Sequence, residues 1–392
     1  MGRHSTYISE ITNTLRTLRH KKGLSKFTID INHPGHVHLF RNLITELQKQ
    51  GHSVSISCRK TTLILWLLEK YHFSYVVHGS KTRVIVLKYF YQIRHIVKSY
   101  FHLKKTGAEI GLGVSITLPI LSGFSKIRSI AFDDDDRKIT PVFAFAASLA
   151  DTLLTPAALA NDKRGNNQIC YSGYHELAYL HPNRFTPDPE VLNKLGVNKD
   201  EIFFLLRFNS FHAHHDMGEK GMTFRQKLHL INHMEKYGKI FISSEYGIDP
   251  EFSKYILTCG PDEIHSVLYY AAMYIGESQT MTSEAAVLGT PAIKCNTFAG
   301  RLSVPNELEH KYSLCYSFNT NEFEKMLSEI DSLMQIRDLK TVWQQRRFAM
   351  LENMIDVTAF FAWFVGNYPE SRNIMLENPE YQNRFKHTIR HY

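Results

Sequence analysis

One segment of the sequence, residues 276–293, combines the residue types that can bind a diphosphate and a sugar diol. Hydroxyl and amide side chains crowd a turn between an apolar strand at 273–275 and a short helix. A helix N-terminus offers free backbone N–H groups and a partial positive charge, and both attract phosphate. Glu284 lies in the first helical turn, where its carboxylate can accept hydrogen bonds from a diol. The segment predicts a nucleoside diphosphate site, with Ser278, Gln279, Thr280, Thr282 and Ser283 in the turn.

A purely structural explanation of the same residues stays open. Ser and Thr are frequent at helix N-termini because their hydroxyls accept hydrogen bonds from the first backbone N–H groups. A Glu in the first turn is favourable without a ligand, since it interacts with the partial positive charge there. Gly289 and Pro291 are typical of residues that end a helix and keep it from resuming.

The elements around this segment alternate between strands and helices. Apolar strands are predicted at 27–31 and 54–58, each followed by a helix, and the alternation resumes at 202–206. This order is typical of a parallel, doubly wound α/β sheet. Ligands of such sheets bind beyond the carboxyl ends of the strands. The loops that fall there are residues 32–36, 133–136, 207–216 and 276–283.

Composition changes along the chain predict its division into segments. Residues 161–200 are rich in Asn, Gly and Pro, as expected of a connection between two domains. The predicted segments are a basic tail (1–25), an N-terminal Rossmann-like domain (26–160), the connection (161–200), a C-terminal Rossmann-like domain (201–335) and C-terminal helices (336–392).

Several long motifs resemble the GT-B superfamily, and most closely its member called domain of unknown function family 354. They include residues 30–38, 171–180, 206–216 and 278–291, and the resemblance covers about residues 26–390. It implies a GT-B fold, in which two Rossmann-like domains enclose a cleft and the C-terminal helices pack back across both. It also implies that the C-terminal domain binds a nucleotide sugar, by preference a UDP-sugar, and that the N-terminal domain is on the acceptor side.

A GT-B relative, the peptidoglycan N-acetylglucosaminyltransferase, implies roles for individual residues. Its Gly-Gly-His-Val segment is similar to residues 34–37, so His36 would face the cleft as a base, with His33 and His38 as rivals. A His with a pKa near neutrality suits that task, although a cap or turn residue is the alternative. The diphosphate and ribose segment of that relative is similar to residues 278–284, so Glu284 would bind ribose. The implied substrate-binding set is His33, Arg207, Asn209, His214, Glu245, His265, Ser278, Gln279, Thr280, Met281, Thr282 and Glu284.

A second relative, the hydrolysing UDP-N-acetylglucosamine 2-epimerase, uses carboxylates at the ends of two N-terminal strands. At the first such place the chain has Gly-Val-Ser at 113–115, without an acid, and at the second it has four Asp residues at 133–136. We assign Asp133 to catalysis, while a solvated acidic loop or a site for a divalent cation or the acceptor are alternatives. His214 and its neighbours at 212–216 have the spacing of metal ligands, but no further ligand is evident. Neither a metal nor a cofactor is predicted.

The charge of the chain suggests a second partner. Its net charge is +8, and residues 81–105 interleave seven Lys or Arg with apolar and aromatic residues. That pattern suits a helix on an anionic membrane surface, and a core-facing helix with solvated lysines is the alternative. No nucleic-acid-binding module is visible, so that partner is not expected.

The compartment and the function follow from these observations. Scattered Cys residues, and the absence of both a signal sequence and a bilayer-spanning apolar run, favour the cytoplasm, with attachment to the inner face of the cell membrane if the basic helix binds lipid. The favoured function is glycosyl transfer from a nucleotide sugar to a glycan or lipid-linked acceptor in surface polysaccharide or glycolipid synthesis. A nucleotide-sugar 2-epimerase or hydrolase and a non-catalytic nucleotide-sugar-binding protein are the alternatives.

Overall fold

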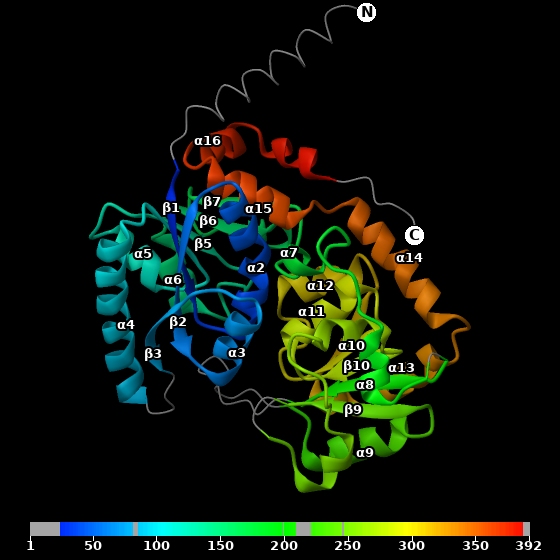
Figure 1. Ribbon diagram of the computed structural model, residues 1–392. Coiled ribbons are helices and arrows are strands. Elements are labelled where there is room, and N and C mark those ends of the chain that lie inside the picture. The colour runs from blue at the N-terminus through cyan, green and yellow to red at the C-terminus, as the bar shows by residue number, and fades with distance from the viewer. Residues whose placement is uncertain (1–23, 81–84, 199, 209–220, 245–246, 387–392) are drawn as a thin grey trace, which may run out of the picture.

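The computed structural model describes residues 24–80, 85–198, 200–208, 221–244 and 247–386 of the 392-residue chain. Two parallel β-sheets with interleaved helices form two halves that lie side by side (Figure 1). This architecture confirms the predicted α/β class with two Rossmann-like halves. Only the last two residues of the predicted tail belong to the described part of the chain.

The first sheet has seven described strands in the order β3-β2-β1-β4-β5-β6-β7, all parallel. The winding reverses between β1 and β4, and such a reversal creates a crevice beyond the strand ends. The strands are β1 Lys26–Ile31, β2 Ser53–Lys60, β3 Val76–Ser80, β4 Ile110–Gly113, β5 Arg128–Phe132, β6 Thr152–Pro156 and β7 Gln168–Tyr171. The helices are α2 Pro34–Lys49, α3 Thr62–Lys70, α4 Ile85–Thr106, α5 Thr117–Ser122, α6 Pro141–Ser148 and a 3₁₀ turn Ala157–Leu159.

The second sheet has five described strands in the order β12-β11-β10-β8-β9. Its central strand β10 leads directly into α11, which Ser278 caps and Gly289 ends with a φ of 71°, as the sequence predicts. The strands are β8 Phe203–Arg207, β9 Lys239–Ser243, β10 Met273–Gly276, β11 Ala292–Cys295 and β12 Cys315–Phe318. The helices are α9 Phe224–Met234, α10 Ile264–Tyr270, α11 Gln279–Leu288, α12 Ser303–His310 and α13 Phe323–Met334, with 3₁₀ turns Pro250–Tyr255 and Thr320–Glu322.

The segment predicted as a connection, residues 161–200, is more structured than its composition suggests. Its first part forms β7, the edge strand of the first sheet, so that sheet extends to Tyr171 and not to residue 160. The remainder contains the short helices α7 (Leu177–Leu180) and α8 (Glu190–Leu195), and α7 is completely buried. Apolar positions such as Leu177 and Leu180 explain this burial, because they fill the contact between the halves.

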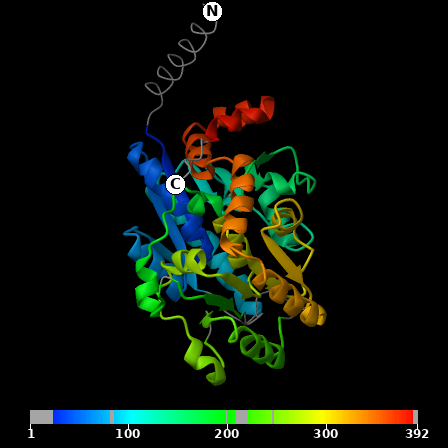
Figure 2. The ribbon, with the colours of Figure 1, turned by 90° about the vertical axis from the view of Figure 1, so that its right-hand side faces the viewer.

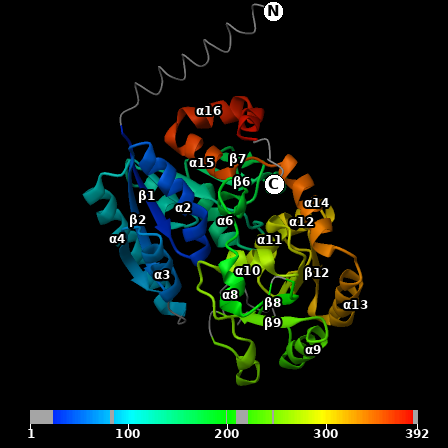
Figure 3. The same ribbon diagram turned by 45° about the vertical axis from the view of Figure 1, so that its right-hand side comes forward.

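The C-terminal helices run from the second half back onto the first (Figures 2 and 3). They are α14 Leu339–Glu352, α15 Val357–Gly366 and α16 Glu370–Glu377, followed by a 3₁₀ turn Pro379–Phe385. Helix α15 packs on the first sheet, where the rings of Phe361 and Phe132 are 4.9 Å apart. Among the described residues one stretch, Leu339–Gly366, is long enough for a membrane span and contains an 18-residue window with a mean hydropathy of 1.4. We assign it to the core, because 67% of its apolar window is buried and it divides into α14 and α15.

Candidate functional site

The N-terminus of α11 forms the predicted diphosphate turn, but its hydroxyls differ in availability. The Ser278 hydroxyl accepts the N–H of Met281 at 3.4 Å, and Thr282 is fully buried and donates to the Ser278 carbonyl at 2.7 Å. Both hydroxyls therefore bind backbone groups at the start of the helix, as the explanation without a ligand predicts. Thr280 is exposed, and helical geometry leaves the N–H groups of Gln279 and Thr280 without an intrahelical acceptor. A phosphate would meet these backbone groups and the Thr280 hydroxyl.

A buried lysine lies behind this turn. Lys294 in β11 has no exposed surface, and its Nζ donates to Oε1 of Gln279 at 2.8 Å. Burial lowers the pKa of Lys294 to about 8. The side-chain Nε2 of Gln279 is buried and has no hydrogen-bond partner within the described residues. Lys294 is not among the site residues predicted from the sequence, where its only signal is a charge within an otherwise apolar strand.

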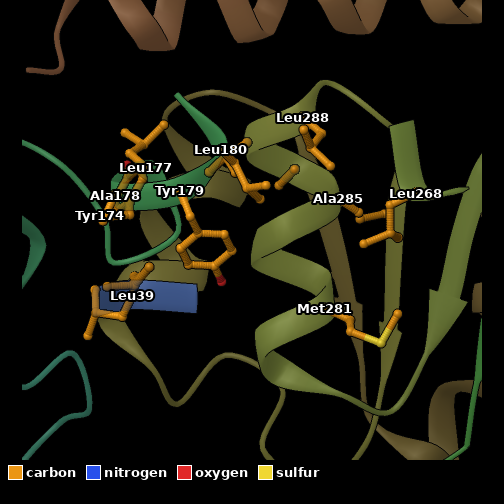
Figure 4. Close-up of a cluster of buried hydrophobic side chains, with 14 of the residues drawn as sticks. Leu39, Tyr174, Leu177, Ala178, Tyr179, Leu180, Leu268, Met281, Ala285 and Leu288 are labelled. Carbon is orange, nitrogen blue, oxygen red and sulfur yellow. The ribbon is translucent and has the colours of Figure 1, made fainter. Parts of the chain in front are cut away.

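Glu284 lies in the second turn of α11 and not in the first, because the helix begins at Gln279, and it is held at the contact between the two halves. Its Oε1 accepts the hydroxyl of Tyr179 in α7 at 2.8 Å and lies 3.0 Å from Nε2 of His265 in α10. Figure 4 shows the Tyr179 ring pointing from α7 toward α11. Only 5% of Glu284 is exposed. A ribose diol would therefore have to use the second carboxylate oxygen or displace Tyr179.

His265 lies at the contact between the two halves. It is buried beneath Glu284, with its ring centroid 4.7 Å from that of His38 in α2. Burial, followed by repulsion from His265, holds the pKa of His38 well below its usual value. His265 and His38 thus join the two halves, and His265 orients Glu284, while a position of His265 beside a nucleotide base stays a prediction. His38 is too deeply buried to rival His36 in the cleft.

His33 and His36 lie where the chain passes from β1 into α2. Nδ1 of His33 accepts the N–H of Gly35 at 3.1 Å, so His33 is the helix cap. His36 is half-buried, and its Nδ1 accepts the N–H of Asn32 at 3.3 Å. Burial, followed by repulsion from His33 and His175, holds the pKa of His36 well below its usual value, which keeps the ring neutral. A neutral ring with a lone pair on Nδ1 carries its hydrogen on Nε2, so His36 is set to donate a hydrogen bond.

Three of the four aspartate side chains at 133–136 have separate partners among the described residues. Asp133 forms a buried ion pair with Arg164, and the backbone of the same loop also binds that guanidinium. Burial raises the pKa of Asp133 to about 6 despite this partner. Asp136 accepts the Ser303 hydroxyl at 2.6 Å and ties the loop to the second half. The loop is therefore only partly exposed, and the Asp133 carboxylate is held in a structural pair with Arg164 rather than directed at a substrate.

Asp134 and two residues that the sequence analysis did not select form the second part of the site. Nδ1 of His175 lies 3.2 Å from Oδ2 of Asp134, while its Nε2 is buried without a partner among the described residues. Burial alone would lower the pKa of His175, but the charge of Asp134 outweighs it and the pKa is raised. Burial, and then repulsion from Asp134, raises the pKa of the adjacent Glu176 to about 8. Two ionisable residues within the apolar motif 171–180 were the available signal.

Asp30 supplies a carboxylate beside the first epimerase position, residues 113–115, which has no acid of its own. Its buried carboxylate at the end of β1 accepts the hydroxyl of Ser115 at 2.6 Å and lies 3.0 Å from Nε2 of His95 in α4. Burial opposes ionisation, but His95, Ser115 and Asn32 outweigh it and hold the pKa of Asp30 well below its usual range. The carboxylate at this place thus comes from β1 and is fully engaged.

The remaining predicted residues are only partly described. Arg207 ends β8 and donates to the Ser243 hydroxyl at 2.8 Å. Asn209, His214 and Glu245 lie outside the described residues, as does the whole segment 212–216. Within the part of the chain that is described, no group of three or more His, Cys, Asp or Glu side chains is arranged as metal ligands.

Comparison with known proteins agrees with this architecture. The family described as protein of unknown function (DUF354) matches residues 25–356. An uncharacterised protein of Methanocaldococcus jannaschii is 24% identical over 282 residues, which are 68% of this chain and 80% of that protein. A UDP-GlcNAc 2-epimerase of the same organism, solved in complex with UDP-GlcNAc and UDP, superposes with a TM-score of 0.59 at 13% identity, covering 83% of this chain and 99% of the other. A Streptomyces glycosyltransferase gives 0.56 at 9% identity, covering 88% and 100%.

These structural neighbours share the fold alone, since their identities are low. They include both glycosyltransferases and UDP-GlcNAc 2-epimerases. The match to the family model spans most of the sequence, including β1, the aspartate loop, α7 and α11. The chain therefore belongs to the family of proteins of unknown function DUF354 and has the GT-B fold.

Proposed function

We propose that this protein is a glycosyltransferase that takes its sugar from a nucleoside diphosphate sugar, by preference a UDP-sugar. One observation carries the proposal: the helix α11 and the loop that holds Asp134 both lie at the contact between the two halves, where Glu284 accepts the Tyr179 hydroxyl and Asp136 accepts the Ser303 hydroxyl. Burial, followed by repulsion from Asp134 and, more weakly, from Glu284, raises the pKa of Glu176 in the same region. The candidate diphosphate helix and the candidate proton-transfer residues thus share one region. A structural neighbour solved with UDP-GlcNAc supports the choice of donor.

The geometry supports a division of roles. Asp134 holds Nδ1 of His175, which leaves Nε2 to accept a proton, as in other His–carboxylate pairs. Attack of the acceptor oxygen on the anomeric carbon would pass the hydroxyl proton to His175 and release the nucleoside diphosphate. The N-terminus of α11, with Lys294 behind it, would stabilise the charge on the leaving diphosphate. His36 would donate a hydrogen bond to the sugar or the diphosphate.

A second candidate function, 2-epimerisation or hydrolysis of the nucleotide sugar, is favoured by Glu176. A carboxyl group with a pKa of about 8 is protonated at neutral pH, while the pKa of Asp134 is lowered by His175 and His36 despite burial. An acid beside a carboxylate can perform the paired proton transfers that such reactions need. Glu176 thereby offers the second acid that residues 113–115 lack.

Incubation of the full-length protein with a panel of nucleoside diphosphate sugars, with and without a membrane lipid extract as acceptor, tests the proposal. Release of nucleoside diphosphate only when the extract is present supports the transferase. Conversion of the sugar nucleotide without the extract, seen by proton NMR, supports the epimerase or hydrolase instead. Calorimetric binding without turnover indicates a non-catalytic binding protein, and no binding of any nucleotide contradicts the donor site.

A further inference from the structure

Helix α4 carries an apolar stripe that faces away from the protein. Phe90, Ile93, Val97 and Phe101 are 60%, 62%, 48% and 65% exposed. Their spacing of three and four residues places them on one side of the helix. The opposite side is buried, where the side chain of His95 is hydrogen-bonded to Asp30 and that of Ser99 to His78. Packing against the protein core, which was the alternative to membrane binding for this helix, therefore accounts for only one of its two apolar sides.

The stripe continues over two neighbouring helices. Helix α5 packs between α4 and α6 and ends beside Phe124, which is 81% exposed. On α6, Val142, Phe145 and Leu149 are 74%, 70% and 53% exposed. These eight side chains, which we call the α4–α6 face, are half of the exposed large apolar residues in the described chain. So dense a group of exposed apolar side chains indicates a binding surface.

The charge around the α4–α6 face selects the kind of partner. Residues 81–132 contain nine Lys or Arg and a single Glu. Their net charge is therefore +8, which equals the net charge of the whole protein. Exposed members flank the stripe on α4 and follow α5: Arg94, Lys98, Lys104, Lys105 and Lys126. Lys is depleted in protein–protein interfaces, whereas basic residues beside inserted aromatic side chains are typical of proteins on anionic lipid. A second copy would oppose one basic face to another, which repulsion disfavours.

We propose that the α4–α6 face binds the surface of an anionic lipid bilayer, with its aromatic side chains at headgroup depth and its basic side chains on lipid phosphates. The inference does not depend on the reaction proposed above. Its position has a consequence for the site, because α4 is hydrogen-bonded to the end of β1. His95 contacts Asp30, Asp30 accepts Asn32, and the N–H of Asn32 donates to His36. A bound bilayer would thus lie against the half that carries His36.

Flotation of the full-length protein with vesicles tests the proposal. We expect binding to vesicles that contain phosphatidylglycerol, weak binding to phosphatidylcholine alone, and release at high salt. Phe101→Ser with Phe145→Ser should weaken binding by more than about tenfold through lost apolar burial. Lys98→Glu with Lys105→Glu should do the same through charge. Leu376→Ser and Arg337→Glu, at exposed positions of α16 and beside α14, are matched controls that should bind normally.

Three outcomes would overturn the proposal. The first is no binding to either vesicle, and the second is binding that survives both double substitutions, since another segment would then be responsible. The third is a dimer that the Phe substitutions dissociate while vesicles remain unbound. Equal thermal midpoints for all variants exclude misfolding as a cause, because every substituted side chain is exposed. Slower amide hydrogen exchange in α4 on vesicle addition provides an independent readout, and unchanged exchange there would count against the proposal.

Discussion

Tyr179 donates its hydroxyl hydrogen to Oε1 of Glu284, 2.8 Å away, and thereby ties the segment between the two sheets to helix α11. The same carboxylate oxygen lies 3.0 Å from Nε2 of His265. Glu284 is thus fixed before any ligand arrives, in the region where a nucleotide sugar would contact both halves. Such preorganisation lets a binding residue act without a further ordering cost.

Tyr179→Phe should destabilise the protein and weaken nucleotide binding. Removing the donor leaves a buried carboxylate with one partner fewer, at a cost of about 1–3 kcal/mol in unfolding free energy. Denaturant unfolding with and without UDP measures both effects. Tyr171→Phe is the matched control, because the Tyr171 hydroxyl is buried without a partner among the described residues. Equal losses in the two variants would contradict the role of the Tyr179 hydroxyl.

Glu176→Gln should stabilise the folded protein at pH 8 and leave it unchanged near pH 4. The folded pKa of Glu176 is raised to about 8 from 4.5, so its contribution to stability is fully present at acid pH. It is lost as the pH rises toward 8, because only the unfolded chain then releases the proton. Thermal midpoints across this range measure the effect, with exposed Glu190→Gln as the control. A constant difference between variant and parent would refute the assignment.

Lys294→Met should weaken nucleoside diphosphate binding without loss of stability at pH 7. The pKa of Lys294 is lowered to about 8 from 10.5, so the folded state disfavours its charge below pH 8. The parent protein should therefore gain stability as the pH rises from 8 toward 10.5, and the variant should not. Calorimetric titration with UDP and unfolding at both pH values measure the two effects. Unchanged UDP affinity would remove Lys294 from the site.

The pH dependence of turnover should follow His175 rather than His36. His175 must be neutral to accept a proton, and its pKa is raised, so kcat/KM should increase with pH through a value above 6.5. His36→Ala should lower the rate without moving this limb, because the pKa of His36 is already well below its usual value. Asp134→Asn should lower kcat about 10²–10⁴-fold, since the ring loses its partner. If the rise of kcat/KM with pH shifts only in His36→Ala, then His36 and not His175 is the base.

Asp133→Asn should lower the stability of the protein but not the turnover of the folded molecule. Asp134→Asn, by contrast, should lower kcat. The substitution leaves the buried Arg164 guanidinium with a weaker set of partners, at a cost of about 3 kcal/mol in unfolding free energy. Any folded fraction should retain turnover, as measured by activity per folded molecule after denaturant titration. Full stability with lost activity would instead restore Asp133 as the catalytic carboxylate.

Much of the fold could be predicted from the sequence because its signals are local. The alternation of strand and helix patterns, the cap at Ser278 and the left-handed Gly289 each depend on a few neighbouring residues. β7 was missed because a four-residue edge strand within a Pro-rich and Asn-rich segment has too weak a pattern. The candidate site was less predictable, since its partners are far apart in the chain.

The sequence by itself determined the two parallel sheets, the turn before α11 and the positions of His33 and His36 at a strand end. Only the tertiary structure decided that Asp133 pairs with Arg164 while Asp134 pairs with His175, although the two aspartates are adjacent. It also decided which of the two apolar sides of α4 is buried. Periodicity records that a side is apolar, but contacts between distant segments determine whether protein or solvent covers it.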